Sequence, residues 1–261
     1  MKTFTVKQIA KKLMEIDDES DSFIQMCRQD ERKGVQRLIE KWEKEKRKQK
    51  RAYIKYLEMK KTEDKLKKQG FRYIAGIDEV GRGPLAGPVV AAAVILPDDF
   101  CLLGLDDSKK LTEKERIKMY IHIRENAIAI GTGIIAEEEI DSFNIYEATK
   151  KAMLSAIVAL KPSPDYLLID AMKLVTPIPQ SSLVKGDSKS ISIAAASIIA
   201  KVTRDKIMKK YSLQFPQYHF ARNMGYGTKD HIAAIKKYGP CRIHRRSFSP
   251  VKEMTENISK Q

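Results

Sequence analysis

Two adjacent carboxylates interrupt a stretch of the chain that otherwise favours a β-strand. Asp78 and Glu79 lie within residues 71–80, which are rich in Ile, Tyr and Phe. Neighbouring side chains on a strand point to opposite faces, so the two acids cannot share one solvated face. A buried carboxylate is unfavourable unless it is paired or bound to a metal. The alternative is a strand end at which both acids are solvated and Arg82 is their partner.

Two more acids lie where a second strand ends and a long helix begins. Asp170 follows the apolar stretch 166–169, and Asp187 precedes a helix expected to end near residue 211. In open α/β sheets, sites form beyond the carboxyl ends of strands. The alternatives are an Asp170 that only shapes a turn and an Asp187 that only caps the helix.

Together the four acids form a candidate site for Mg²⁺ or Mn²⁺, because such ions prefer carboxylate and water oxygens. Two ions of this kind can activate a water molecule and stabilise the leaving oxygen of a phosphodiester. The spacing along the chain leaves open whether the acids converge. The residues concerned are Asp78, Glu79, Asp170 and Asp187.

Other cofactor sites are excluded by their context. Residues 81–86 match the G-x-G-x-x-A form of a dinucleotide-binding fingerprint. That fingerprint requires a helix after the turn, whereas Pro88 and Val89 begin a predicted strand. The two adjacent acids would also repel a pyrophosphate. A Walker A motif is absent, and the four histidines lack the spacing of a zinc site.

The elements that must position these acids alternate between strands and helices from residue 71 onward. This order predicts an α/β fold, with a mixed sheet flanked by helices. Residues 1–70 form a predicted helical extension, Gly70 is the domain boundary, and residues 71–261 form the main domain with a helical C-terminal segment. The predicted strands are 71–80, 89–96, 127–136, 165–170 and 182–184, and the predicted helices are 112–126, 137–160, 187–211 and 229–238.

The charge of the 261-residue chain is unevenly distributed. The net charge is +15, yet residues 71–200 carry 14 basic and 17 acidic side chains, while residues 201–252 carry 13 basic and 2 acidic. Excess positive charge favours a polyanionic partner such as nucleic acid. No apolar run approaches the roughly 20 residues of a membrane span, and the three cysteines are read as reduced thiols. We therefore expect a cytoplasmic monomer without a membrane partner.

The basic residues of the C-terminal part are the stronger candidates for contacts with the phosphates of a nucleic acid. Residues 41–61, with 10 basic and 3 acidic side chains, are a second candidate. The alternative for that segment is a solvated helix packed through Trp42 and Leu57. The C-terminal candidates are Lys201, Arg204, Lys206, Lys209, Lys210, Arg242, Arg245 and Arg246.

Residues 77–89, Ile-Asp-Glu-Val-Gly-Arg-Gly-Pro-Leu-Ala-Gly-Pro-Val, resemble the signature of type 2 ribonuclease H, the bacterial ribonuclease HII family. Further motifs of that family have counterparts in the same order, and the resemblance runs from about residue 72 to residue 250. Residues 81–83, Gly-Arg-Gly, also argue against the related ribonuclease HIII. The further motifs are residues 107–111, 168–170, 185–201, 225–228 and 244–248.

The resemblance implies a ribonuclease H-like, mixed five-stranded sheet and metal-dependent hydrolysis of RNA paired to DNA. It also implies incision on the 5′ side of single ribonucleotides embedded in duplex DNA, leaving 3′-hydroxyl and 5′-phosphate ends. By matching position, the catalytic and metal-binding residues are Asp78, Glu79, Asp170 and Asp187, and the substrate-binding residues are Gly81, Arg82, Gly83, Lys109 and Tyr226.

The implied substrate contacts agree with the chemistry of the ribose. The 2′-hydroxyl is the group that distinguishes RNA from DNA, and glycines let a backbone approach it closely. The resemblance assigns Tyr226 to the sugar at the RNA-to-DNA junction, whereas a turn tyrosine between two glycines is the alternative. Two rival functions are another nuclease of the same fold that cuts DNA alone, and a non-catalytic duplex-binding protein.

Overall fold

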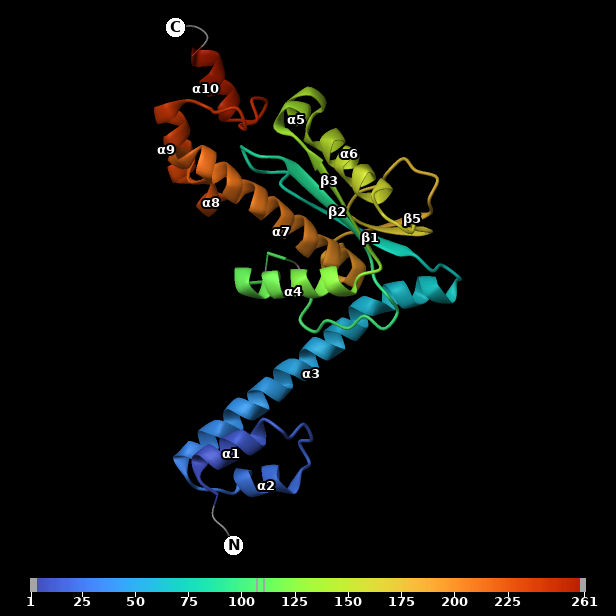
Figure 1. The fold of residues 1–261 in the computed structure, drawn as a ribbon, viewed down its shortest axis with the longest axis vertical. Helices are drawn as coiled ribbons and strands as arrows, with labels where there is room; N and C mark the ends of the chain where they lie inside the picture. Colours follow the sequence, from blue (N-terminus) through green and yellow to red (C-terminus); the bar gives the residue numbers. More distant parts are fainter. Residues whose placement is uncertain (1–3, 107, 110, 259–261) are drawn as a thin grey trace. The chain divides into compact units, whose positions relative to one another are not determined.

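A computed structural model describes residues 4–106, 108–109 and 111–258 (Figure 1). The chain divides into two compact units, Met1–Lys55 and Tyr56–Gln261. The division falls inside the long helix α3 (Lys33–Lys68), whereas Gly70, the predicted boundary, follows the end of that helix. In the described part of the chain, no helix is long and apolar enough to cross a membrane.

The larger unit is built on a five-stranded sheet with the order β3-β2-β1-β4-β5. β1 pairs antiparallel with β2 and parallel with β4. β2 pairs antiparallel with β3, and β4 pairs parallel with β5. This mixed sheet, flanked by helices, confirms the predicted fold class. The strands are β1 (Ile74–Val80), β2 (Val89–Ile95), β3 (Ala129–Ile135), β4 (Tyr166–Asp170) and β5 (Gln180–Leu183).

Helices cover both faces of the sheet (Figure 1). α6 (Ile145–Val158) packs on β2 and β3, and α7 (Ile191–Gln214) packs on β1 and β2. Small residues allow this close approach. A Cβ on Gly133 would lie 2.0 Å from the carbonyl oxygen of Ala152, and one on Gly76 would lie 2.0 Å from the backbone of α7. α4 (Glu113–Asn126) lies beside α7, and α5 (Glu137–Phe143) precedes α6.

The C-terminal segment adds short helices around a separate apolar cluster. Met208, Tyr218, Phe220 and Ile235 are buried in it. The elements after α7 are η2 (Pro216–Tyr218), α8 (Phe220–Asn223), α9 (Lys229–Tyr238) and α10 (Val251–Ile258). Before α7, the turn η1 (Gly186–Ser188) follows β5.

The predicted start of the long helix was wrong by a few residues. Asp187 lies in η1, and α7 begins at Ile191 with Ser190 as its N-cap. The Ser190 side chain accepts a hydrogen bond from the amide of Ile193, so Asp187 is not the cap of this helix.

The smaller unit has a core of its own. α1 (Val6–Leu13), α2 (Ser22–Arg28) and the first part of α3 bury a cluster that includes Ile9, Ile24 and Trp42. The indole of Trp42 donates a hydrogen bond to the carbonyl of Leu13. These helices confirm the helical character predicted for the extension. The last part of α3 belongs to the larger unit, where Tyr56 and Met59 join the core beneath α7.

Candidate active site

Asp78 lies near the end of β1 on the face that α7 covers. It pairs in register with Ala92 of β2, which is buried against α7, and its side chain is only 6% exposed. Burial raises the pKa of Asp78 well above its ordinary value, and the neighbouring charges of Glu79 and Asp170 also raise it. Hydrogen bonds from the Ser197 side chain and the Glu79 amide act in the opposite direction.

Glu79 points to the other face of the strand and is half-buried. Its Oε1 accepts a hydrogen bond from the guanidinium of Arg82 at 3.2 Å, whereas its Oε2 is buried without a partner among the described residues. Burial raises the pKa of Glu79, and Arg82 lowers it. Arg82 is thus a real partner of one acid, but it leaves the second oxygen of that acid unbound.

Asp170 ends β4, the strand that runs parallel to β1. Ile169 is in register with Ile77, so Asp170 reaches the same level of the sheet as Asp78. The charge of Asp170 raises the pKa of both neighbouring carboxyls, which places the three acids near one another. This arrangement follows from the topology, because parallel neighbours bring their carboxyl ends to one edge.

Asp187 is brought to this edge by its own turn. The amide of Gly186 donates a hydrogen bond to Oδ1 of Asp170 at 2.7 Å, which anchors η1 beside the end of β4. Asp187 is half-buried in that turn. The backbone of the fourth acid is therefore one residue from a group that contacts the third.

The donor set fits a hard divalent cation. Among the described residues, no three His, Cys, Asp or Glu side chains are grouped so that they could hold a metal ion. The carboxylates nevertheless present oxygens alone, with the buried Oε2 of Glu79 unsatisfied and the pKa of Asp78 raised by burial and by its acidic neighbours. A cation at this position would lower the cost of keeping both acids charged.

The glycine turn after β1 lies beside Tyr226. Gly81 has φ +94°, a conformation that favours glycine, and residues 82 and 83 are exposed. A Cβ added to Gly83 would lie 4.0 Å from Cε1 of Tyr226, whose side chain is 41% exposed. The amide of Leu85 donates to the carbonyl of Gly225, which ties the two segments together.

Lys109 lies on the α7 side of the acids. The preceding residue, Ser108, is buried, and its hydroxyl accepts a hydrogen bond from Ser197, the residue that also contacts Asp78. Lys109 itself is exposed. Residues 107 and 110 of the same motif lie outside the described residues.

Only some of the basic residues that were predicted to contact phosphates lie on the surface. Arg204 and Arg245 are 0% exposed, so the expectation that they face phosphates was wrong. Lys201 and Lys209 are paired with Asp205 and Glu113. The exposed cations of the predicted set that form no ion pair with a described acid are Lys206, Lys210, Arg242 and Arg246.

The matched regions identify the chain. The model of the family described as ribonuclease HII matches residues 75–251, and a second model, the ribonuclease HII N-terminal domain, matches residues 5–67. The chain belongs to the ribonuclease HII family. Members of this family are endoribonucleases, and membership implies ribonuclease H activity on RNA/DNA hybrids.

Known proteins agree with this assignment over nearly the whole chain. A ribonuclease HII of Bacillus cytotoxicus is 57% identical over 257 residues, covering 98% of this chain and 99% of the relative. The crystal structure of ribonuclease H2 from Pyrococcus horikoshii is 26% identical with a TM-score of 0.61, covering 73% of this chain and all of the other. Bst ribonuclease HIII, solved in complex with Mn²⁺, shares the fold at 18% identity and a TM-score of 0.51, covering 72% and 71% of the two chains.

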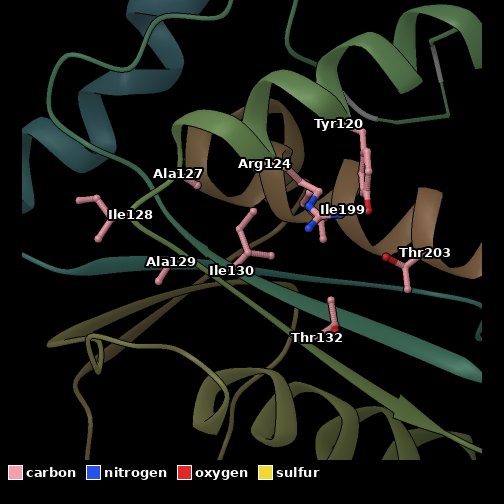
Figure 2. A pocket seen from close by; sticks show the side chains of 9 residues that line it. All are labelled: Tyr120, Arg124, Ala127, Ile128, Ala129, Ile130, Thr132, Ile199 and Thr203. Carbon is pink, nitrogen blue, oxygen red and sulfur yellow. Dashed lines mark hydrogen bonds between the residues drawn. The ribbon is translucent and has the colours of Figure 1, made fainter.

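A separate hollow lies between α4, β3 and α7 (Figure 2). It contains none of the predicted site residues, so this hollow does not mark the acid cluster. Lys206 lies 4.3 Å from the centre of the Tyr120 ring at this hollow. Its lining residues are Tyr120, Arg124, Ala127, Ile128, Ala129, Ile130, Thr132, Ile199 and Thr203.

Proposed function

We propose that the protein cleaves the RNA strand of RNA/DNA hybrids and incises duplex DNA on the 5′ side of an embedded ribonucleotide, so that ribonucleotides can be removed from DNA. The products carry 3′-hydroxyl and 5′-phosphate ends. The observation that carries the proposal is that Asp78 and Asp170 lie at the same level of neighbouring parallel strands, with Glu79 and the Gly81–Gly83 turn following Asp78 and the turn of Asp187 hydrogen-bonded to Asp170.

The four acids are proposed to hold two divalent cations, Mg²⁺ or Mn²⁺. When bound, such ions supply an activated water and stabilise the leaving oxygen of the phosphodiester. Asp78 and Asp170 approach from parallel strands, and the anchored turn η1 brings Asp187 to them. Glu79 contributes the oxygen that Arg82 leaves unbound.

Recognition of the ribose is assigned to the glycine turn and Tyr226. The exposed backbone at residues 82 and 83 can approach a 2′-hydroxyl without a Cβ at Gly83 in the way. The exposed ring of Tyr226 is next to this backbone and can pack on the neighbouring sugar. The phosphates are assigned to Lys109 and to four exposed C-terminal cations, whose contacts supply affinity without sequence preference. These cations are Lys206, Lys210, Arg242 and Arg246.

We propose that the protein acts as a cytoplasmic monomer. Its proposed partner is the nucleic acid duplex that it cleaves. The charge supports a nucleic acid partner, because residues 201–252 carry 13 basic and 2 acidic side chains.

One assay separates this function from its rivals. A labelled DNA duplex with one ribonucleotide, an RNA/DNA hybrid and an all-DNA duplex are each incubated with the protein in Mg²⁺, in Mn²⁺ and in a chelator. We expect cleavage of the first two substrates in metal and none of the third. Cleavage of all-DNA duplex would favour another nuclease of this fold, and binding without metal-dependent cleavage would favour a non-catalytic binding protein.

A further inference from the structure

Two arginines are buried beneath the turn that follows β1. Arg204 lies on α7 and Arg245 lies between α9 and α10, and both are 0% exposed. Burial lowers the pKa of Arg245 to about 9, so the group is still charged at neutral pH. Water cannot satisfy these guanidinium groups, and each must find its partners in the protein.

Arg245 binds carbonyl groups at both ends of the turn. Its Nε donates to the carbonyl of Gly87 at 2.9 Å, and its Nη2 donates to Gly81 at 2.5 Å and to Gly87 at 2.7 Å. Its Nη1 donates to the carbonyl of Arg82 at 2.9 Å. Its backbone amide donates to the carbonyl of Leu85 at 2.8 Å. One residue therefore fixes the start, the middle and the end of the turn.

Arg204 connects the same turn to the segment that carries Tyr226. Its Nε donates to the carbonyl of Pro88 at 2.9 Å, and its Nη2 donates to Ala86 at 3.0 Å. Its Nη1 donates to the carbonyl of Met224 at 2.8 Å, two residues before Tyr226. A single planar group thus sets the distance between the two segments.

Neither arginine forms an ion pair with an acid in the described part of the chain, so backbone carbonyls are their main partners. Arginine suits this role because its rigid fork offers five donors, whereas lysine offers three donors around one atom. A lysine at either position would keep the charge but could not reach the same carbonyls together.

We propose that Arg204 and Arg245 are positioning residues that hold the Gly81–Gly83 turn and Tyr226 at the spacing needed to read a ribonucleotide. This inference rests on the proposed function of that site. It assigns to the two arginines an effect on the rate of cleavage, exerted through the turn and the tyrosine, and no contact with the nucleic acid.

The test compares Arg204→Lys and Arg245→Lys with the wild-type protein on a duplex that contains one ribonucleotide. We expect kcat to fall about 10- to 100-fold, because small displacements of positioning groups cost rate of this order. KM and the affinity for an all-DNA duplex should change by less than about twofold, since phosphate contacts on the surface remain. Failure of the wild-type protein to cut would overturn the proposed function instead.

Two control variants separate positioning from general instability. Arg222→Lys changes an exposed arginine of α8 and should leave kcat unchanged. Met153→Ala removes buried apolar volume from the cluster between the sheet and α6, which contains no residue of the turn, and so lowers stability away from it. The inference is overturned if the two lysine variants lose no more activity than Met153→Ala when the melting temperatures are lowered equally.

A double variant tests the route of the effect. If Arg204 acts by placing Tyr226, then Arg204→Lys should lower kcat by less than about threefold in a Tyr226→Ala background. A full multiplicative loss would contradict that route.

Hydrogen exchange of the wild-type protein tests the inference without any variant, should a lysine variant fail to fold. The amides of Leu85 and Gly87 donate to carbonyls of Gly225 and Ile243, and we expect them to exchange as slowly as the amides of β1. Fast exchange at both positions would overturn the inference, because a turn that opens freely is not held in place.

Discussion

The two turns that carry the proposed site are held by different chemistry. The turn after β1 is bound by the guanidinium groups of Arg204 and Arg245, which donate to its carbonyls. The residues just after the turn that carries Asp187 are hydrogen-bonded to side chains of α3. Thr62 donates from its hydroxyl to the carbonyl of Lys189 at 3.1 Å, and the turn's amide at Gly186 is bound by Asp170.

A buried acid completes the support of the second turn. Oε1 of Glu63 accepts hydrogen bonds from the Ser190 hydroxyl at 2.5 Å and from the Ser192 amide at 3.0 Å. Burial raises the pKa of Glu63, and these hydrogen bonds lower it. An acceptor at the start of α7 is favourable because the first amides of a helix lack partners within it. The last part of α3 therefore supports the edge that carries Asp187.

The first turn is held by arginines of the sheet unit itself, whereas the residues after the second turn are held by α3, a helix that begins outside that unit. Changes at the first turn should disturb the reading of the ribose. Changes at the second should disturb the start of α7 and the position of Asp187.

Alanine substitutions in the two turns should differ most in their effect on the free energy of unfolding. A Cβ on Gly81 would lie 2.3 Å from Nε of Arg204 and 2.7 Å from the carbonyl oxygen of Pro88, at a φ of +94°. We expect Gly81→Ala to lower the free energy of unfolding by on the order of 3 kcal/mol or more. A Cβ on Gly186 would meet the movable end of Ile193 at 2.6 Å, so Gly186→Ala should cost about 1 kcal/mol.

Urea unfolding of both variants, with Gly83→Ala as the control, measures this difference. The Cβ of an alanine at position 83 would meet nothing closer than Tyr226 at 4.0 Å. Equal losses for Gly81→Ala and Gly186→Ala would show that the two turns are equally rigid.

Acid should loosen the first turn before the second. His244 forms an isolated β-bridge with Ala86. Burial, and after it the charge of His231, lowers the pKa of His244 to about 4. The unfolded chain binds the proton near pH 6.5. Stability from this group is therefore complete above about pH 6.5 and is lost as the pH falls toward 4, by up to about 3 kcal/mol.

Unfolding free energies between pH 7.5 and pH 4.5, compared with those of His244→Gln, measure this effect. The wild-type protein should lose more stability than the variant across that window. Parallel curves would exclude His244 as the cause.

Loss of the Glu63 carboxyl should lower stability by less than Gly81→Ala does. Glu63→Ala leaves the Ser190 hydroxyl and the Ser192 amide without their acceptor, so we expect a loss of about 2 kcal/mol. Glu63→Gln keeps an acceptor oxygen at the same place and should lose less than about 1 kcal/mol. Thermal melts of the pair measure the difference, and equal losses would indicate that charge, and not hydrogen bonding, supports α7.

Local sequence signals were sufficient to predict the sheet and to single out the candidate acids. Asp78 and Glu79 are conspicuous inside an apolar strand, and Asp170 ends a short apolar stretch, so each is visible within a window of ten residues. The mixed sheet follows from the order of such stretches along the chain. The resemblance to the family added the glycine turn and Tyr226, which composition alone would not distinguish from ordinary turns.

The hydrogen bonds that hold the two turns of the site could not be predicted, because they join residues that are far apart in sequence. Glu63 and Ser190 are separated by 127 residues, and no local pattern pairs them. The positive charge of the C-terminal part predicts phosphate contacts for Arg204 and Arg245, because a charge count does not distinguish a buried guanidinium from an exposed one. Asp187 was assigned next to the helix start, since the extra turn η1 has no signal other than Gly186.

The proposed role of Asp78 in metal-dependent incision at a ribonucleotide is tested by Asp78→Asn. The wild-type protein, Asp78→Asn and the exposed control Asp99→Asn are incubated in Mg²⁺ with an end-labelled duplex containing one ribonucleotide. We predict one cut on the 5′ side of the ribonucleotide by the wild-type protein and Asp99→Asn, and none by Asp78→Asn, which should still bind the duplex. Turnover by Asp78→Asn at a rate near that of the wild-type protein would contradict the assignment.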